Sequence, residues 1–189
     1  MTRKAVFDAF RAFMGGRLTM AEAAAMEEFL DKFRPREGEA AERKVSPKGI
    51  ALMHKWEGCR LEAYPDPGSA NGKPWTIGWG STGSDIDLGT VWTQKQADER
   101  FERDLELYAR QVAKAIGDAP TTQDQFDALV AFHYNTGAIK TATLTKRHIA
   151  GDYEGAAREF RKWRFNDGKE MRGLVNRRAD EERLYRGLA

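Results

Sequence analysis

Apolar residues recur three or four positions apart over residues 4–14 and again over 19–33, which is the spacing of amphipathic helices. Two glycines separate these segments, and Thr19 with Glu22 forms the pattern of a capping box at the start of the second. We therefore expect an N-terminal helical hairpin over residues 1–33. Its phenylalanines favour docking onto the rest of the chain, although a wall- or membrane-contacting module and a family-specific decoration are alternatives.

Residues 34–45 break this pattern, because they are rich in charge and offer almost no apolar side chain to bury. The segment also contains a proline and a glycine, which favour turns over helices. This composition predicts a linker. We expect a separate main domain over residues 46–189.

The hydrophobic pattern resumes with a short helix. Ser46 and Pro47 are the favoured N-cap and first residue, and Gly58 ends the pattern directly after Glu57. Glycines, prolines and β-forming residues then alternate over residues 61–83, which predicts a small, turn-rich antiparallel sheet.

The rest of the chain is predicted to be helical. Thr93 with Gln96 forms a second capping box, Thr122 begins a largely apolar segment, and Gly137 resembles a glycine C-cap. The predicted helices cover roughly 94–116, 123–136, 141–150, 152–163 and 174–186, with a loop over 164–173. The predicted fold class is therefore α+β and mostly helical, with the helix over 123–136 as the buried centre.

Composition narrows the functional classes. A chain of 189 residues that is 41% hydrophobic can bury one substantial core. The 31 basic and 29 acidic residues leave a net charge of only +2, so no nucleic-acid partner is expected. Residues 158–186 hold ten basic and six acidic residues, which favours a solvated helix face over a surface for an anionic wall polymer.

The sequence predicts no cofactor and no metal, because the three histidines lack metal-ligand spacing and a single cysteine cannot complete a zinc set. The start of the chain lacks the continuous apolar segment of a secretory signal, and no later run is long enough to span a bilayer. We expect a monomer that stays in the cytoplasm of the cell that makes it unless something else releases it.

Two acids close together in sequence carry the candidate chemistry. Glu57 lies in the last turn of a helix, where the helix dipole and burial both favour the protonated form. Asp66 lies in a proline-rich turn, where backbone N–H groups and water favour the charged form. Such a pair suits glycosidic bond cleavage, in which one carboxyl protonates the leaving oxygen and the other stabilises the developing cation or activates water. Either acid alone is weak evidence in a chain with 29 of them.

Several segments, in this order, resemble the phage-type lysozymes of glycoside hydrolase family 24, which serve as phage endolysins. These segments are "EGCRLEAYPD", "TIGWGSTG", "QFDALVAFHYNTG", "AGDYEGAAREFRKW" and "GLVNRRADEERLY". The resemblance covers residues 46–188 and implies a lysozyme-like fold, with a sheet lobe joined to a helical lobe by a long helix. It implies a muramidase that cleaves the β-1,4 bond between N-acetylmuramic acid and N-acetylglucosamine in peptidoglycan.

The resemblance also implies roles for individual residues. Glu57 matches the general acid, Asp66 the second catalytic carboxylate, and Thr76 the residue that positions the attacking water. An inverting reaction is implied, with the two carboxyl groups roughly 6.5–9.5 Å apart. Two glycines after Thr76 are expected to let substrate approach the backbone closely.

Three further positions are expected to support the site. Asn135 matches a polar position that contacts sugar, and either Arg177 or Arg178 matches the arginine that pairs with the catalytic glutamate. That pairing would oppose the effects of the dipole and burial. Ser81 replaces a histidine common in relatives, which removes a plausible structural ion pair.

The expected protein is an endolysin that acts on peptidoglycan glycan strands and depends on a separate holin-type membrane permeabiliser. Two alternatives remain open from the sequence. A lytic transglycosylase of the same fold needs only one acid and forms an anhydro sugar, and a wall-binding or virion structural protein would retain the fold without catalysis.

Overall fold

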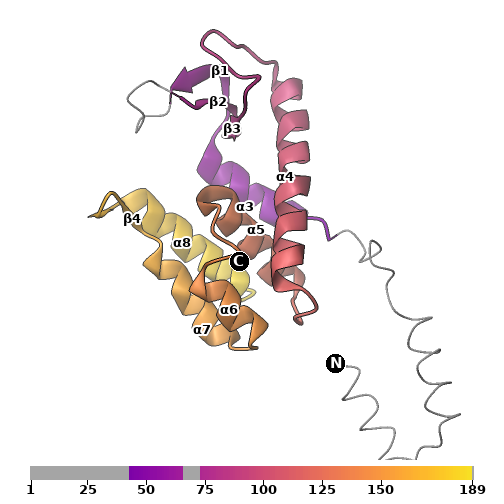
Figure 1. The fold of residues 1–189 in the computed structure, drawn as a ribbon, viewed down its shortest axis with the longest axis vertical. Helices are drawn as coiled ribbons and strands as arrows, with labels where there is room; N and C mark the ends of the chain where they lie inside the picture. The colour runs from indigo at the N-terminus through magenta and orange to yellow at the C-terminus, as the bar shows by residue number, and fades with distance from the viewer. Residues whose placement is uncertain (1–42, 66–72, 189) are drawn as a thin grey trace, which may run out of the picture. The chain divides into compact units, whose positions relative to one another are not determined.

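The computed structural model describes residues 43–65 and 73–188 (Figure 1). They belong to one compact unit, which begins at Arg43. The predicted hairpin over 1–33, most of the predicted linker and Asp66 lie outside the described residues, so they stay predictions.

The described residues form an α+β fold that is mostly helical, as the sequence predicts. The elements in chain order are α3 (Pro47–Glu57), β1 (Arg60–Pro65), β2 (Trp75–Gly78), β3 (Ser81–Thr82), α4 (Gln94–Ile116), α5 (Gln123–Thr136), α6 (Thr143–Ile149), α7 (Tyr153–Glu159), the 3-10 helix η1 (Phe160–Lys162), β4 (Phe165–Asn166), β5 (Lys169–Glu170) and α8 (Arg172–Tyr185). Figure 1 shows the three-stranded sheet at one end of this unit, the shorter helices at the other, and α4 running along both.

The predicted small sheet is present as three antiparallel strands in the order β1-β2-β3. Its register places Tyr64 of β1 opposite Thr76 of β2, and Thr76 in turn opposite Thr82 of β3. The pairing of β1 with β2 shifts between Arg60 and Tyr64. The middle strand therefore carries Thr76, one of the predicted site residues.

The helix ends follow the predicted capping residues. Thr93 and Thr122 each accept a hydrogen bond from the backbone three residues on and complete a capping box. Gly137 closes α5 in the left-handed conformation, with a φ of 66°. Local sequence chemistry thus sets where α4 and α5 start and where α5 stops.

The start of α3 is anchored to α5 by Asp127, which is fully buried. Its carboxylate accepts a hydrogen bond from the Ser46 backbone N–H at 3.0 Å and another from the Ser46 hydroxyl. Gln123 donates to the same carboxylate at 2.7 Å. Val45, inside the predicted linker, packs into the core, which explains why the compact unit begins before residue 46.

The centre of the domain is α5, as predicted. Eight consecutive residues of this helix, 126–133, are buried, because α3, α4 and α8 all pack around it. A helix that is buried on all sides needs apolar side chains around its whole circumference. The packing of these three helices therefore holds in place the end of α5 that lies nearest the candidate site.

The segment predicted as a loop over 164–173 differs from the expectation. It contains the short antiparallel hairpin β4–β5, and α8 begins at Arg172. Asp167 and Gly168 adopt positive φ values of 48° and 74°, which turn the chain tightly enough for two residues on each side to pair. The Asp-Gly dipeptide was the available signal for this hairpin.

No helix among the described residues is long and apolar enough to cross a membrane. Across the same residues, no group of three or more histidine, cysteine, aspartate or glutamate side chains is arranged to hold a metal ion.

Candidate active site

Glu57 is the last residue of α3, at the position where Gly58 ends the helix. Two preceding side chains fasten this end of α3 to α8. Lys55 forms an ion pair with Asp180 at 2.7 Å, and the Trp56 indole N–H donates to the same carboxylate at 3.2 Å. The backbone that carries Glu57 is therefore held against α8.

The Glu57 carboxylate is confined on two sides. Arg177 of α8 donates from Nη2 to Oε1 at 2.7 Å, and the Glu57 side chain is 15% exposed. Gly80 lies against the other oxygen, since a Cβ built on this glycine would come within 3.0 Å of Oε2. Gly80 also has a φ of 91°, so a larger residue there would be strained as well as crowded.

This position of Gly80 corrects the expectation that both glycines after Thr76 serve substrate approach. Gly80 makes room for the Glu57 carboxylate. A Cβ at Gly78 would lie 3.2 Å from the Trp92 ring, so that glycine allows packing within the protein.

Behind Glu57, a buried network extends along α8 to α5. Glu181 has no exposed surface and accepts hydrogen bonds at Oε1 from Arg177 at 3.1 Å and from Arg178 at 2.8 Å. Arg178 also donates to the Asn135 side-chain oxygen at 2.9 Å. The sequence left open which arginine pairs with Glu57. The structure assigns Arg177 to Glu57 and Arg178 to Asn135.

Burial dominates the electrostatics of this network. Desolvation raises the pKa of Glu181 to about 7, while the positive charges of Arg178 and Arg177 oppose the shift. Desolvation also lowers the pKa of Arg178, although Glu181 opposes that change. The arginines and glutamates form an interdependent set in which removal of one charge leaves another uncompensated.

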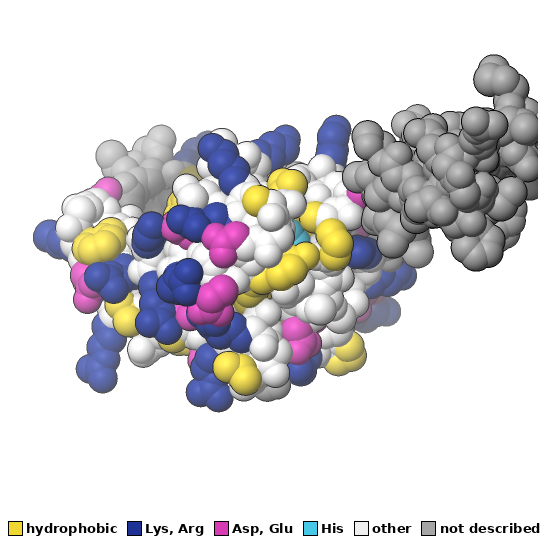
Figure 2. Space-filling model, turned by 90° about the horizontal axis from the view of Figure 1, so that it is seen from below, with side chains coloured by type: hydrophobic (Ala, Val, Ile, Leu, Met, Phe, Trp, Pro, Cys, Tyr) yellow, Lys and Arg dark blue, Asp and Glu magenta, His cyan; other side chains and the backbone are white. Residues whose placement is uncertain are grey.

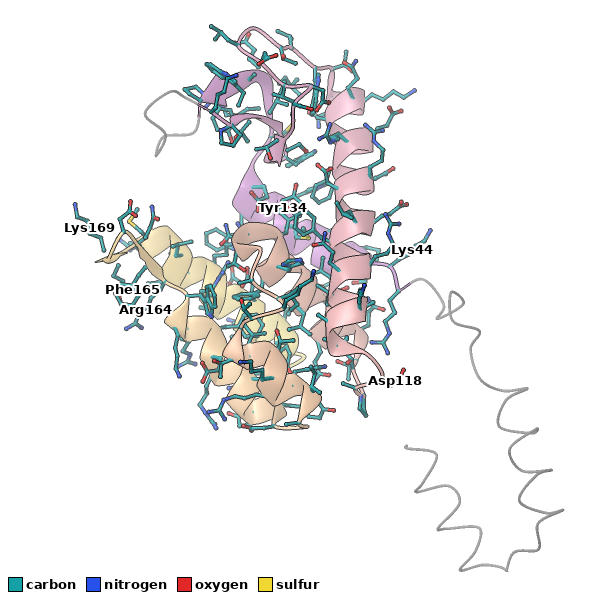
Figure 3. All side chains as sticks on the ribbon, viewed as in Figure 1. Lys44, Asp118, Tyr134, Arg164, Phe165 and Lys169 are labelled. Atoms are coloured by element: carbon teal, nitrogen blue, oxygen red, sulfur yellow. The ribbon has the colours of Figure 1, made fainter. Side chains whose placement is uncertain are left out.

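Tyr134 connects the helical lobe to the turn that faces Glu57. Its hydroxyl donates to the Trp79 backbone carbonyl at 2.9 Å, and Gly80 directly follows that residue. Figure 3 shows Tyr134 at the end of α5 nearest the sheet. Burial raises the pKa of Tyr134, and the nearby Glu57 charge adds to the shift. The tyrosine is therefore a neutral hydrogen-bond donor that fixes the Trp79–Gly80 turn.

Ser81 takes a structural role between the sheet and α4. It is buried and donates to Asp104 of α4 at 2.7 Å. Asp104 also pairs with Arg100 at 3.1 Å. Ser81 and Asp104 thus make a polar connection between the sheet and α4, and Arg100 supplies the positive partner.

A pocket of about 700 Å³ lies beside this network. Its walls come from the ends of α3 and α5, the β4–β5 hairpin and the start of α8. The lining residues are Trp56, Asn135, Thr136, Trp163, Phe165, Asn166, Met171, Gly173, Leu174 and Arg177. Aromatic and amide side chains together suit the faces and hydroxyls of sugar rings.

The structure brings together four of the six predicted site residues: Glu57, Asn135, Arg177 and Arg178. Thr76 lies half-buried on β2. It takes no part in this hydrogen-bonded network among the described residues. Sequence reasoning missed Tyr134, although its position directly before the predicted site residue Asn135 was an available signal.

Residues 54–181 match the family model of the phage lysozymes. The chain is 40% identical over 144 residues to an endolysin of Bacillus phage PZA, which covers 75% of this chain and 55% of that relative. It is 36% identical to an endolysin of Acyrthosiphon pisum secondary endosymbiont phage 1, which covers 75% of this chain and 97% of the relative.

Among solved structures, the fold is similar to the muramidase domain of SpmX from Asticaccaulis excentricus. That similarity has a TM-score of 0.66 and 30% identity, and covers 76% of this chain and 97% of that one. The fold and the family match together define a lysozyme-like protein. The chain belongs to the phage lysozyme family. It spans about half the length of the two Bacillus phage endolysins it matches.

Proposed function

We propose that this protein is an endolysin-type muramidase, a glycoside hydrolase that cleaves the β-1,4 bond between N-acetylmuramic acid and N-acetylglucosamine in peptidoglycan. The observation that carries the proposal is the Glu57 carboxylate, held at 2.7 Å by Arg177, which itself lines the adjacent pocket. Membership of the phage lysozyme family and similarity to a protein named as a muramidase support the same activity.

In this proposal, Glu57 is the general acid that protonates the leaving glycosidic oxygen. Arg177 occupies Oε1, so the transferable proton belongs on Oε2. Asp66 is the second carboxylate and Thr76 positions the attacking water, as the family resemblance implies. We propose an inverting reaction, in which a water lies between the two carboxyl groups and attacks the anomeric carbon from the opposite face.

The pocket beside Glu57 is proposed to hold the glycan strand. Asn135 is oriented by the hydrogen bond from Arg178, which leaves its amide N–H₂ group to donate to a sugar oxygen. Trp163 and Phe165 provide aromatic surface for the apolar faces of the sugars. No cofactor or metal is required for this chemistry.

We further propose that the protein acts as a monomer and reaches the wall after a separate holin-type protein permeabilises the membrane. Expression of the protein alone should leave cells intact, while addition of a permeabiliser should cause lysis. Turbidity of the culture measures both outcomes, and rapid lysis by the protein alone would contradict the dependence.

The activity is tested by Glu57→Gln, which keeps the side-chain shape and removes the transferable proton. We expect the release of muropeptides to fall by roughly 10²–10⁴-fold with the fold unchanged, because that is the usual contribution of general acid catalysis. Glu62→Gln, on exposed β1, is the matched control and should retain full activity. Unchanged wall clearing by the Glu57 variant would remove this residue from the chemistry.

The masses of the products separate the competing functions. Hydrolysis adds one water to each cleaved bond, whereas a lytic transglycosylase forms an anhydro sugar without adding water. Wild-type products that carry the added water support the hydrolase. Wall binding without any released product would instead support a non-catalytic role.

A further inference from the structure

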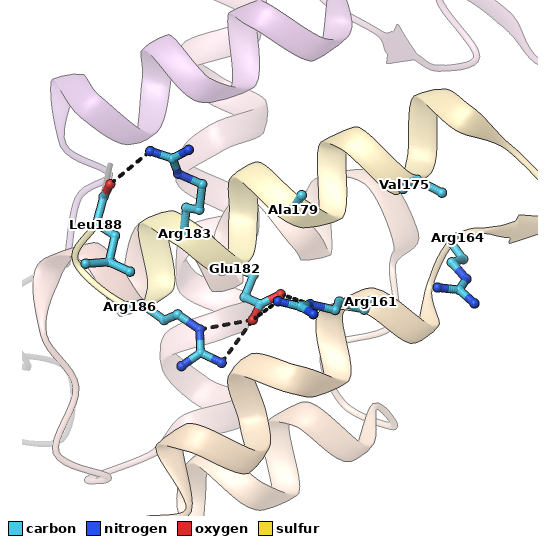
Figure 4. Close-up of a pocket in the computed structure, with 8 residues that line it drawn as sticks. All are labelled: Arg161, Arg164, Val175, Ala179, Glu182, Arg183, Arg186 and Leu188. Atoms are coloured by element: carbon cyan, nitrogen blue, oxygen red, sulfur yellow. Dashed lines mark hydrogen bonds and ion pairs between the residues drawn. The ribbon is translucent and has the colours of Figure 1, made fainter.

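A second pocket, of about 590 Å³, is lined by residues of α8 and of the segment around η1 (Figure 4). It is lined by Arg161, Arg164, Val175, Ala179, Glu182, Arg183, Arg186 and Leu188. Four arginines and one glutamate line it, and Glu154 and Glu170 pair with Arg186 and Arg164 at its edge, so a small excess of positive charge is left. The proposed reaction uses none of these residues.

Glu182 fixes two of the arginines in place. It is almost fully buried and pairs with Arg161 from η1 and with Arg186 from its own helix (Figure 4). Arg161 makes two hydrogen bonds to this carboxylate, and Arg186 approaches it at 2.9 Å. One buried acid thus holds two guanidinium groups at the pocket, which reduces the side-chain entropy lost when a ligand binds them.

The other two arginines are more available to a ligand. Arg183 is exposed, and its contact in Figure 4 is a long hydrogen bond of 3.5 Å to the Leu188 carbonyl. Among the described residues it has no carboxylate within ion-pair distance. Arg164 pairs with Glu170 at 2.7 Å, where both side chains are about half exposed. Such exposed pairs are weak, so a ligand carboxylate can replace Glu170.

The remaining lining is apolar and small. Val175 and Ala179 lie one helical turn apart on α8, and Leu188 closes the far end (Figure 4). A ligand matched to this pocket therefore carries anionic groups together with small apolar side chains.

The mixed charge on the face seen in Figure 2 argues against an extended polyanion as a ligand. Figure 2 shows lysine and arginine side chains interspersed with aspartate and glutamate on the face seen from below. Nucleic acid favours a continuous basic stripe, and a membrane surface favours a flat or protruding apolar face. A concave pocket with separate arginines and a small apolar floor suits discrete carboxylates instead.

We propose that this pocket binds a short acidic peptide with small apolar side chains, and that its natural ligand is the alanine- and glutamate-containing peptide stem of peptidoglycan. Identification of the stem as the ligand rests on the proposed function. The arginines bind the stem carboxylates, and the apolar floor contacts the alanine methyl groups.

Occupancy of this pocket is compatible with catalysis, because the two sites use different faces of α8. Residues 175, 179, 182 and 186 follow each other at helical spacing on one face. Arg177 and Glu181 belong to the face that packs toward α5 and Glu57. A peptide in this pocket therefore does not block the active site, because the two linings share no residue.

The test is an NMR titration of the ¹⁵N-labelled full chain with the synthetic stem L-Ala-γ-D-Glu-meso-diaminopimelate-D-Ala. We expect saturable shifts at the amides of Val175, Ala179 and Leu188. The double variant Arg164→Gln/Arg183→Gln should weaken binding by about fivefold to twentyfold, since exposed pairs are worth about two- to fivefold each. The single variant Arg183→Gln, which breaks no ion pair of the folded protein, should give about half of this effect on a logarithmic scale.

Two controls separate recognition from general charge. Arg103→Gln, on exposed α4, removes the same charge elsewhere and should leave the affinity unchanged. A stem peptide with its carboxylates amidated should fail to bind. Equal binding of the amidated peptide, equal weakening by Arg103→Gln, or shifts confined to the pocket around Asn135 would each overturn the proposal.

The titration requires no turnover, so it stands apart from the proposed activity. Hydrolysis of glycan strands stripped of their peptides tests the activity alone, and the Arg183→Gln variant should cleave them at the wild-type rate. If the wild-type protein does not cleave these strands, the proposed muramidase activity is contradicted. Binding of the stem peptide can still be measured in that case. Normal cleavage without binding would contradict only the peptide site.

Discussion

Two consecutive glutamates on α8 each accept hydrogen bonds from two arginines, yet Glu181 belongs to the network behind Glu57 and Glu182 lines the second pocket. Glu181 has no exposed surface and holds Arg177, whose side chain is only 6% exposed. Glu182 is also buried, but its partner Arg161 is 68% exposed. The same pair of residue types is therefore enclosed by protein on one face and open to water on the other.

The contrast shows that exposure to solvent changes the cost of losing one partner of an arginine–glutamate pair. In the enclosed cluster the charges depend on one another, because no water replaces a lost partner. In the open cluster water solvates the exposed arginines, and the buried Glu182 keeps one arginine when the other is removed. The enclosed cluster holds Glu57 in a fixed position, whereas the open cluster can exchange its partners for a ligand.

The largest difference is expected from loss of an arginine. Arg177→Ala leaves Glu57 and Glu181 without their shared donor and should lower the free energy of unfolding by about 3–5 kcal/mol. Arg161→Ala leaves the buried Glu182 with Arg186 as its partner and should cost less, about 1–2 kcal/mol. Urea denaturation of both variants measures the contrast, and equal losses would show that the two clusters do not differ in this way.

The pH dependence of the free energy of unfolding should also distinguish the two clusters. Burial raises the pKa of Glu181 to about 7 in the folded protein, so the folded state binds its proton more tightly than the unfolded chain does. This residue's contribution to stability is therefore greatest below its unfolded pKa of about 4.3 and is lost as pH rises to about 7. Glu181→Gln should remove that decline.

Denaturation midpoints between pH 4 and 8 would report the effect. Glu182→Gln, on the open face, provides the matched control for the substitution itself. Identical pH profiles for the two variants would contradict the assignment of the decline in stability to Glu181.

The smallest expected effect concerns the hydrogen bond from Tyr134 to the Trp79 carbonyl. Tyr134→Phe should cost about 0.5–1.5 kcal/mol of stability and lower kcat severalfold with KM unchanged, because the turn beside Glu57 loosens. Tyr153→Phe removes a similar tyrosine-to-carbonyl bond, to Pro120, far along the chain from Glu57. Steady-state hydrolysis of both variants would test the positioning role. A loss of kcat as large in Tyr153→Phe would assign the effect to general stability.

The sequence predicted those parts of the fold that depend on local chemistry. Thr93, Thr122 and Gly137 define helix ends through bonds to their own neighbours, and the structure confirms them. The β4–β5 hairpin was missed because each strand has only two residues, too short for alternation of apolar and polar positions to appear.

Site prediction was limited by contacts distant in sequence. The approach of Gly80 to Glu57 spans 23 positions and the bond from Tyr134 to Trp79 spans 55, so no local pattern encodes either contact. Arg177 was expected as one of two candidates, because family resemblance supplied what spacing could not. The roles of Asp66 and Thr76 stay predictions that rest on that resemblance.

The anchoring of Ser46 by Asp127 bears on how the protein can be attached to a surface. One helix of 11 residues separates this anchor from Glu57, a span of about 16 Å at 1.5 Å per residue. A tether joined upstream of residue 43 would transmit its pull to α5, the most enclosed helix of the domain. An immobilised form fastened at that point should keep the geometry around Glu57 intact under flow.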